Sequence, residues 1–177
     1  MAMDINVLTI KAQQALQSAV TVAQRSGQQA VEPLHLLSVL IADNDDLGAF
    51  LLGKCGVNLP NLRGGVAEAL SRLPKVSGSG EQYFATDMTK VIQRAVDFTK
   101  KFNDKYASIE HLLLALVAER GTSSELLKSQ GVKESELIEV IRQFRKGSTI
   151  GSQSDDKQFD ALGKYAINLN ELARTGK

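Results

Sequence analysis

Two histidines are the residues whose type and spacing first suggest chemistry. His35 and His111 stand 76 residues apart in similar contexts, Glu32-Pro-Leu-His-Leu-Leu and Ser108-Ile-Glu-His-Leu-Leu. An imidazole pair could bind a metal or act in acid–base catalysis, which would indicate a hydrolase or a metalloprotein. The chain has neither the H-E-x-x-H spacing of zinc enzymes nor a nucleophile elbow. Each histidine falls in the first turn of a predicted helix, where an imidazole can satisfy a backbone or capping group, so a structural role is favoured.

The other groups that could support catalysis give weaker signals. Cys55 is the single cysteine, and its basic neighbour is Lys54. A nucleophilic thiol needs a base and a group that orients the base, so we predict a structural thiol. No Gly-x-x-x-x-Gly-Lys-Ser/Thr motif is present to hold nucleotide phosphates. We therefore predict that this 177-residue chain is not itself an enzyme. We predict no catalytic, metal-binding or cofactor-binding residue in it.

Charge and hydropathy exclude two classes of partner. The 21 basic and 20 acidic residues leave a net charge of +1, too small a field to hold nucleic acid or an anionic membrane surface. No apolar run approaches the length of a membrane span, and Met1-Ala-Met-Asp4 does not resemble a secretion signal. We expect a cytoplasmic protein that binds neither nucleic acid nor membrane.

The elements that carry the histidines occur twice. At an offset of 76, residues 8–42 align with residues 84–118, and the identities include both histidines and the leucines that follow them. Beyond one deleted residue the offset becomes 75, which places Gly56 over Gly131. The pattern predicts two copies of one structural unit.

Each copy is predicted to contain four helices. In the first copy, apolar residues recur at steps of three and four from Ala12 to Ala23, Pro33 begins a second helix, and Gly56 ends a third as a left-handed residue. A fourth helix reaches Pro74.

The second copy repeats this plan. Ser108 is the expected N-cap of one helix, and Thr122 with Glu125 has the spacing of a capping box. No segment shows the period-two alternation of a strand. The predicted fold is all-α, an eight-helix bundle built by pseudo-twofold duplication of a four-helix repeat.

Composition sets the predicted boundaries. The domain covers residues 1–146, with repeat one at 8–74 and repeat two at 84–146. A Gly/Ser-rich segment at 76–81 joins the copies, and a second at 147–154 is predicted to be a flexible linker.

Three separated features resemble one family. The doubled repeat, the two Glu/Ser-x-x-His-Leu-Leu helix starts, and the tail that runs from Leu162-Gly-Lys-Tyr165 to Asn168–Lys177 are similar to the amino-terminal domain of the Clp/AAA+ ATPases. The similarity is closest to the ClpB-type protein disaggregases. In this family, residues corresponding to 155–177 lead to the first ATPase domain.

The resemblance implies a function and a set of partners. It implies a substrate-binding domain of an ATP-dependent chaperone that captures hydrophobic segments of unfolded or aggregated proteins. The parent protein would be a homohexamer that uses ATP and Mg²⁺ and works with a DnaK-type chaperone. These residues by themselves would be monomeric and would bind no cofactor.

The resemblance also implies site residues. In the family, residues matching Thr9, Asp104 and Glu110 help to bind unfolded substrate, beside an apolar groove to which Ile92 would correspond. His111 follows Glu110 in the same helix start and completes the predicted substrate-binding set. Glu110 also has a structural interpretation, because a carboxylate in the first turn of a helix is favoured by the helix dipole.

A comparison with a related branch of the family bears on the predicted site. A related branch, ClpC, recognises phosphorylated arginine with a Thr-Glu-His helix start in both repeats, whereas this chain has Leu34 where the first acid would stand. The departure argues against a symmetric pair of phosphoarginine sites. The alternative functions are an adaptor-docking domain of a ClpA- or ClpC-type proteolytic ATPase, and an enzyme built on the histidines.

Overall fold

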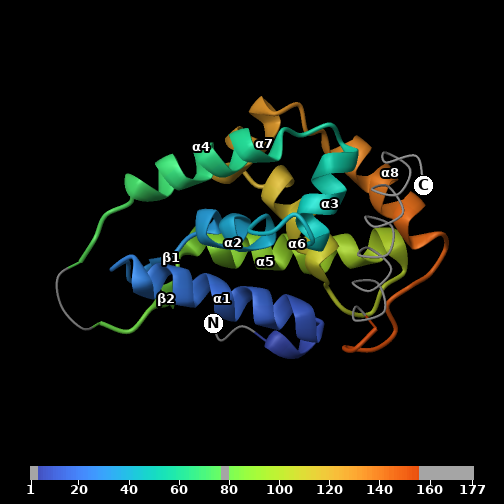
Figure 1. Cartoon of the computed structure of the whole chain (residues 1–177). Coiled ribbons are helices and arrows are strands. Elements are labelled where there is room, and N and C mark those ends of the chain that lie inside the picture. Colours follow the sequence, from blue (N-terminus) through green and yellow to red (C-terminus); the bar gives the residue numbers. More distant parts are fainter. Residues whose placement is uncertain (1–3, 77–79, 156–177) are drawn as a thin grey trace.

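Residues 4–76 and 80–155 are described by a computed structural model, and helices dominate them (Figure 1). The predicted all-α fold is confirmed. None of the described helices is long and apolar enough to cross a membrane. The α-helices are α1 (Ile10–Arg25), α2 (Pro33–Leu40), α3 (Leu47–Lys54), α4 (Leu59–Ser71), α5 (Thr86–Phe98), α6 (Ile109–Ala118), α7 (Thr122–Ser129) and α8 (Glu134–Arg145), with 3-10 turns at Ile5–Val7 and Thr99–Phe102.

The helix boundaries follow the predicted duplication. Helices α5 and α6 begin 76 residues after α1 and α2, and α7 and α8 begin 75 residues after α3 and α4. The backbone turns repeat as well: Gly56 and Gly131 have φ of 85° and 86°, and Gly27 and Asn103 have φ of 70° and 55°. Gly56 and Gly131, which follow the third helix of their copies, are thus left-handed residues as the sequence predicts.

Short parallel pairings join the two copies. Strand β1 (Ala30–Val31) pairs with β2 (Tyr83–Phe84), and Leu8 forms an isolated bridge with Ala107. At the offset of 76, Leu8 corresponds to Phe84 and Val31 to Ala107. The pair Leu8–Ala107 is therefore equivalent to the pair Phe84–Val31, with the two copies exchanged. The sequence analysis predicted no strand, because two residues are too few to show alternation.

Helices α2 and α6 form the centre of the bundle (Figure 1). Every residue from Glu110 to Val117 is buried, as are Leu36 and Leu37 of α2. A helix that is apolar all round must be covered on all sides, and α1, α4, α5, α7 and α8 supply this cover. The start of α6 is therefore deep inside the domain.

One predicted helix cap is not formed. Helix α7 begins at Thr122, with Gly121 as its N-cap and no side-chain capping bond. Thr122 is the first helical residue and not the cap, so the capping box predicted for Thr122 and Glu125 is wrong. Ser124 instead donates a hydrogen bond from its hydroxyl to the carbonyl of Val117, at 2.6 Å.

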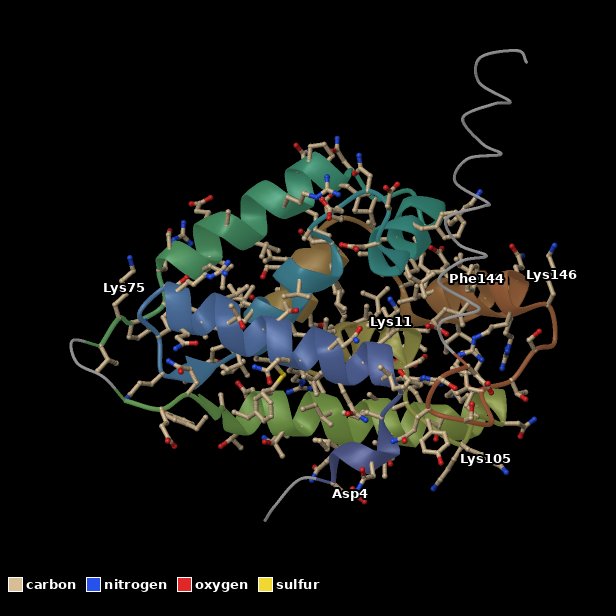
Figure 2. The ribbon with its side chains drawn as sticks, turned by 60° about the horizontal axis from the view of Figure 1, so that its bottom comes forward. Asp4, Lys11, Lys75, Lys105, Phe144 and Lys146 are labelled. Atoms are coloured by element: carbon tan, nitrogen blue, oxygen red, sulfur yellow. The ribbon has the colours of Figure 1, made fainter. Side chains whose placement is uncertain are left out.

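The segment after α8 is anchored, in contrast to the flexible linker predicted at 147–154. Ile150 is fully buried, and its carbonyl accepts from the Lys105 N–H at 2.8 Å. Gln153 accepts from the Ile10 N–H through its carbonyl, at 2.9 Å. Figure 2 shows Lys105 beside this orange-red segment. The segment predicted to lead to an ATPase domain covers residues 155–177, and all of it except Asp155 lies outside the described residues. Residues 77–79 of the first linker also lie outside them.

Removing the buried part of the Ile150 side chain should destabilise the domain. We expect Ile150→Ala to lower the free energy of unfolding by about 2–4 kcal/mol, because a buried isoleucine leaves a cavity. Urea denaturation measures the loss. Ile5→Ala is the control, since Ile5 is 49% exposed, and it should change stability by less than about 0.5 kcal/mol. Equal effects for the two variants would contradict the anchoring of this segment.

Candidate functional site

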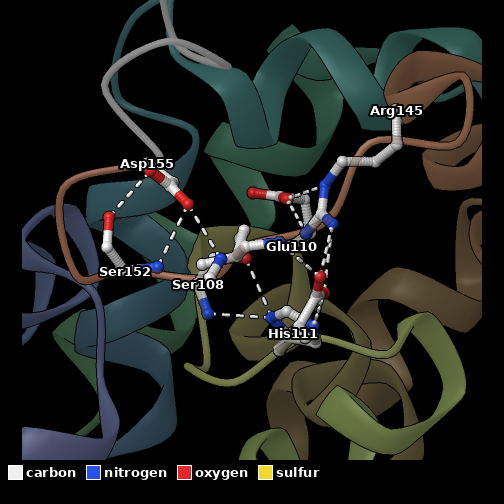
Figure 3. Close-up of polar contacts among 9 residues, drawn as sticks. Ser108, Glu110, His111, Arg145, Ser152 and Asp155 are labelled. Carbon is white, nitrogen blue, oxygen red and sulfur yellow. Dashed lines mark hydrogen bonds and ion pairs between the residues drawn. The ribbon is translucent and has the colours of Figure 1, made fainter.

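A buried ionic cluster lies at the start of α6 (Figure 3). Arg145, the last residue of α8, donates to Glu110 Oε2 from Nε at 2.8 Å and from Nη2 at 2.6 Å. Its Nη1 donates to both oxygens of Asp104, at 2.9 and 3.0 Å. All three residues are buried. One guanidinium therefore pairs with two carboxylates that would otherwise repel each other in the interior.

His111 belongs to this cluster and also caps its own helix. Its Nδ1 accepts from the Ser108 N–H at 2.8 Å, and its Nε2 lies 2.8 Å from Asp104 Oδ2. Because Nδ1 accepts a hydrogen bond, the ring carries its proton on Nε2, facing the carboxylate. In the first copy, His35 Nδ1 accepts from the Glu32 N–H at 2.9 Å. The capping role predicted for both imidazoles is confirmed.

The first copy provides a neutral version of the same arrangement. At the offsets of the duplication, Gln28 corresponds to Asp104, Leu34 to Glu110 and Leu70 to Arg145. The pairing is retained, since Gln28 Oε1 lies 2.6 Å from His35 Nε2 and its Nε2 donates to the Leu70 carbonyl at 3.2 Å. The first copy thus reaches the corresponding helix arrangement without charges.

The cluster sets the charge of its members. Burial by itself raises the pKa of Asp104, but hydrogen bonds from His111, Arg145 and the Ile150 N–H outweigh burial and hold that pKa below its ordinary value. Burial by itself lowers the pKa of Arg145, but Glu110 and Asp104 outweigh it and raise that pKa. Asp104 and Arg145 are consequently an ionised pair at neutral pH.

A groove lies between α1, the α2–α3 junction and the start of α6, which we call the α1–α6 groove. Its volume is about 220 Å³. The groove has apolar walls with polar residues among them, and it is lined by Lys11, Gln14, Ala15, Ser18, Val39, Leu40, Asp46, Leu47, Gly48, Ile109 and Glu110. Figure 2 shows Lys11 at the beginning of α1. Glu110 connects this groove to the ionic cluster, because Oε2 binds Arg145 while Oε1 is buried with no hydrogen-bond partner among the described residues.

The predicted site residues occupy different places in this arrangement. Asp104, Glu110 and His111 lie together in the cluster, and Glu110 alone of the five lines the α1–α6 groove. Thr9 caps α1 by accepting from the Ala12 N–H at 3.2 Å. Ile92 is only 1% exposed and packs in the core. All five are buried, so their direct contact with a substrate stays a prediction.

Sequence reasoning missed Arg145 and most of the residues that line the groove. The signal for Arg145 was available, since an arginine stands where the first copy has Leu70, an apolar residue of α4. Gln14, Ser18 and Val39 gave no comparable signal, because ordinary polar and apolar residues on helix surfaces are common.

The family is decided by the match to a family model. The Clp repeat (R) N-terminal domain matches residues 7–130. This chain belongs to that family. Curated relatives include the chaperone protein ClpB of Porphyromonas gingivalis, 43% identical over 175 residues, and that of Bacteroides thetaiotaomicron, 42% identical over 175 residues. Each alignment covers 99% of this chain and 20% of the relative, so the chain spans about a fifth of the length of these ClpB proteins.

Solved structures of Clp N-terminal domains share the fold. The Hsp104 N-terminal domain from Candida albicans superimposes with a TM-score of 0.70 at 18% identity, covering 82% of this chain and 96% of that chain. The ClpD N-terminal domain from Arabidopsis thaliana gives 0.60 at 23% identity, covering 82% and 99%. The predicted resemblance to a ClpB-type N-terminal domain is confirmed.

The neutral arrangement of the first copy predicts what happens when the charges are removed. Arg145→Leu should lower the free energy of unfolding by about 3–5 kcal/mol, because two buried carboxylates lose their counter-ion. The triple variant Asp104→Gln, Glu110→Leu, Arg145→Leu reproduces the first copy and should fall within about 1 kcal/mol of the unaltered chain or exceed it. Urea denaturation compares them. A triple variant as unstable as the single one would show that the second copy needs its charges to fold.

The lowered pKa of Asp104 predicts a loss of stability in acid. Its carboxyl binds protons less readily in the folded state, so its contribution is present above the unfolded pKa, about 3.9, and is lost as the pH falls through the folded value. The Asp104→Asn variant should be less stable than the unaltered chain at neutral pH, and its free energy of unfolding should change less with pH below about pH 5. Urea titrations in steps of pH measure both effects, with Asp45→Asn at an exposed position as the control. An unchanged pH slope in Asp104→Asn would contradict this assignment.

Proposed function

We propose that this domain captures exposed hydrophobic segments of unfolded or aggregated polypeptides in the α1–α6 groove. It would act as the N-terminal substrate-binding domain of a ClpB-like ATP-dependent chaperone. The observation that carries the proposal is the groove itself, which has apolar walls with polar residues among them and is lined at one end by the buried Glu110.

The lining of the groove suits a polypeptide of variable sequence. Val39, Leu47 and Ile109 offer apolar surface without a deep pocket that would select one side chain. Glu110 Oε1 is buried and has no donor among the described residues, so a shift of this side chain toward the groove would let a backbone N–H of a bound segment supply one. Backbone groups are common to all polypeptides, so a contact of this kind adds affinity without selecting a sequence.

Binding at one groove should be weak. Each buried apolar side chain contributes about 1.5–3 kcal/mol, and association costs several kcal/mol in lost freedom of motion. In a hexameric parent protein, six tethered copies would regain affinity through effective concentration. We propose that this parent is a cytoplasmic ATPase that uses ATP and Mg²⁺ and cooperates with a DnaK-type chaperone, as the similarity to ClpB implies.

Polar substitutions in the groove wall test the proposal. We expect Val39→Asn and Ile109→Asn each to weaken binding of a labelled, reduced and carboxymethylated lactalbumin about five- to tenfold, because each removes apolar contact area. Fluorescence anisotropy measures the affinity. Val140→Asn is the matched control, because Val140 is also a half-buried valine on a helix but lies on α8, away from the groove.

The same titration decides between capture and docking. Unchanged affinity in both groove variants would contradict binding at the α1–α6 groove. If the unaltered domain binds no unfolded polypeptide but retains one folded protein at equal stoichiometry, the adaptor-docking function is correct and the capture function is wrong.

A further inference from the structure

The duplication gives the domain a second groove, which we call the α5–α7 groove. It lies between α5, the start of α2, and the turn from α6 into α7, and its volume is about 540 Å³. At the offsets of the duplication its lining corresponds to that of the α1–α6 groove. Lys90, Val91, Arg94, Leu116 and Leu34 take the places of Gln14, Ala15, Ser18, Leu40 and Glu110.

The chemistry of the two grooves differs. Two uncharged polar residues of α1 are replaced by the cations Lys90 and Arg94 on α5, and Arg120 adds a third cation before α7. Leu34 and Gly121 stand where the other groove has Glu110 and Asp46, so neither of those acids has an acidic counterpart here. Asp87 in turn stands where the other groove has Lys11. Lys90 and Arg120 form no ion pair within residues 4–76 and 80–155, whereas Arg94 Nε lies 2.9 Å from Glu119 Oε1.

The beginning of α7 is the part of this groove that lacks partners. Asp46 precedes α3 in the first copy, but Gly121 precedes α7 and supplies no side chain. The amide N–H groups of Thr122, Ser123 and Ser124 find no acceptor among the described residues. Ser123 also lines the groove and is 4% exposed, and its buried hydroxyl has no hydrogen-bond partner in the part of the chain that the structure describes. Uncapped amides and a free hydroxyl at a helix N-terminus are donors suited to an anion.

Three acids also line the groove: Glu32 and Asp87 belong to the starts of α2 and α5, and Glu119 lies three residues before Thr122. Glu32 is the N-cap of α2, where its backbone carbonyl accepts from the His35 N–H at 3.0 Å, and Asp87 is in the first turn of α5. Glu119 is paired with Arg94. The groove therefore combines acids at the starts of α2 and α5 with cations on α5, and it has Arg120 and uncapped amides at the start of α7.

We propose that the α5–α7 groove binds an extended polypeptide through an acidic side chain. The carboxylate occupies the uncapped N-terminus of α7, and an adjacent apolar side chain packs against Leu34, Val91 and Leu116. This inference rests on the proposed function, because it assumes that the domain binds unfolded polypeptides. It adds a second class of segment, rich in Glu or Asp, to the uncharged apolar segments of the α1–α6 groove.

Two labelled peptides and one pair of variants test the assignment. The peptides alternate Leu and Ser, have amidated C-termini, and differ by a single central Glu or Gln. Thr122→Asp places a carboxylate at the exposed first position of α7, where the helix dipole favours it, so this variant should fold. We expect it to bind the Glu peptide about tenfold more weakly than the unaltered domain, since repulsion replaces a charge-assisted contact. Thr122→Asn is the matched control and should bind within about twofold of the unaltered domain.

The outcomes separate this inference from the proposed function. Equal affinity of the unaltered domain for the Glu and Gln peptides, or equal affinity of Thr122→Asp and Thr122→Asn for the Glu peptide, would overturn it. Equal binding of a Gln peptide that carries a free C-terminal carboxylate would overturn the assignment to a side chain. Val39→Asn should leave the Glu peptide unaffected. The Glu peptide can give the expected affinities while unfolded lactalbumin binds Val39→Asn as tightly as the unaltered domain. In that case only the proposal for the α1–α6 groove is wrong.

Discussion

A single buried guanidinium links separate parts of the second half of the domain. Arg145 ends α8 and binds Glu110 at the start of α6 and Asp104 in the preceding loop. Asp104 also accepts from the Ile150 N–H at 2.8 Å, which fixes the segment after α8. Breaking such a pair on one side leaves a charge in the interior, and that is more costly than never burying the charges. The cluster therefore constrains three parts of the chain and leaves one oxygen of Glu110 at the α1–α6 groove.

The duplicated sequence provides its own control for this cluster. The first copy places Gln28, Leu34 and Leu70 at the corresponding positions and reaches the same helix arrangement. The charges of the cluster are thus a feature of the second copy and not of both repeats. The difference extends to both grooves: one has a buried acid and mostly uncharged walls, and the other has three cations, three acids and an uncapped helix. A single fold can in this way offer two surfaces for different polypeptide segments.

Much of the fold could be predicted from the sequence, because local signals determined it. The offset of 76, the apolar periodicity, and the glycines after α3 and α7 predicted the helices, and the imidazoles were correctly predicted as caps. The ionic cluster was not predictable in the same way, since Asp104 and Arg145 meet across 41 residues of sequence. The burial of Ile150 was not predicted, because a single apolar residue in a Gly/Ser-rich segment shows no hydrophobic periodicity. Ile92 was expected beside a groove, but its position on the apolar stripe of α5 places it in the core.

The central claim is that polypeptide binds where the ionic cluster meets the α1–α6 groove. Chemical-shift mapping of the ¹⁵N-labelled domain with an unlabelled, permanently unfolded polypeptide tests it most directly. The account predicts that the amides of Lys11, Gln14, Val39 and Ile109 shift together and saturate with one affinity. Shifts confined to the outer face of α4, or spread evenly over the surface, would contradict it.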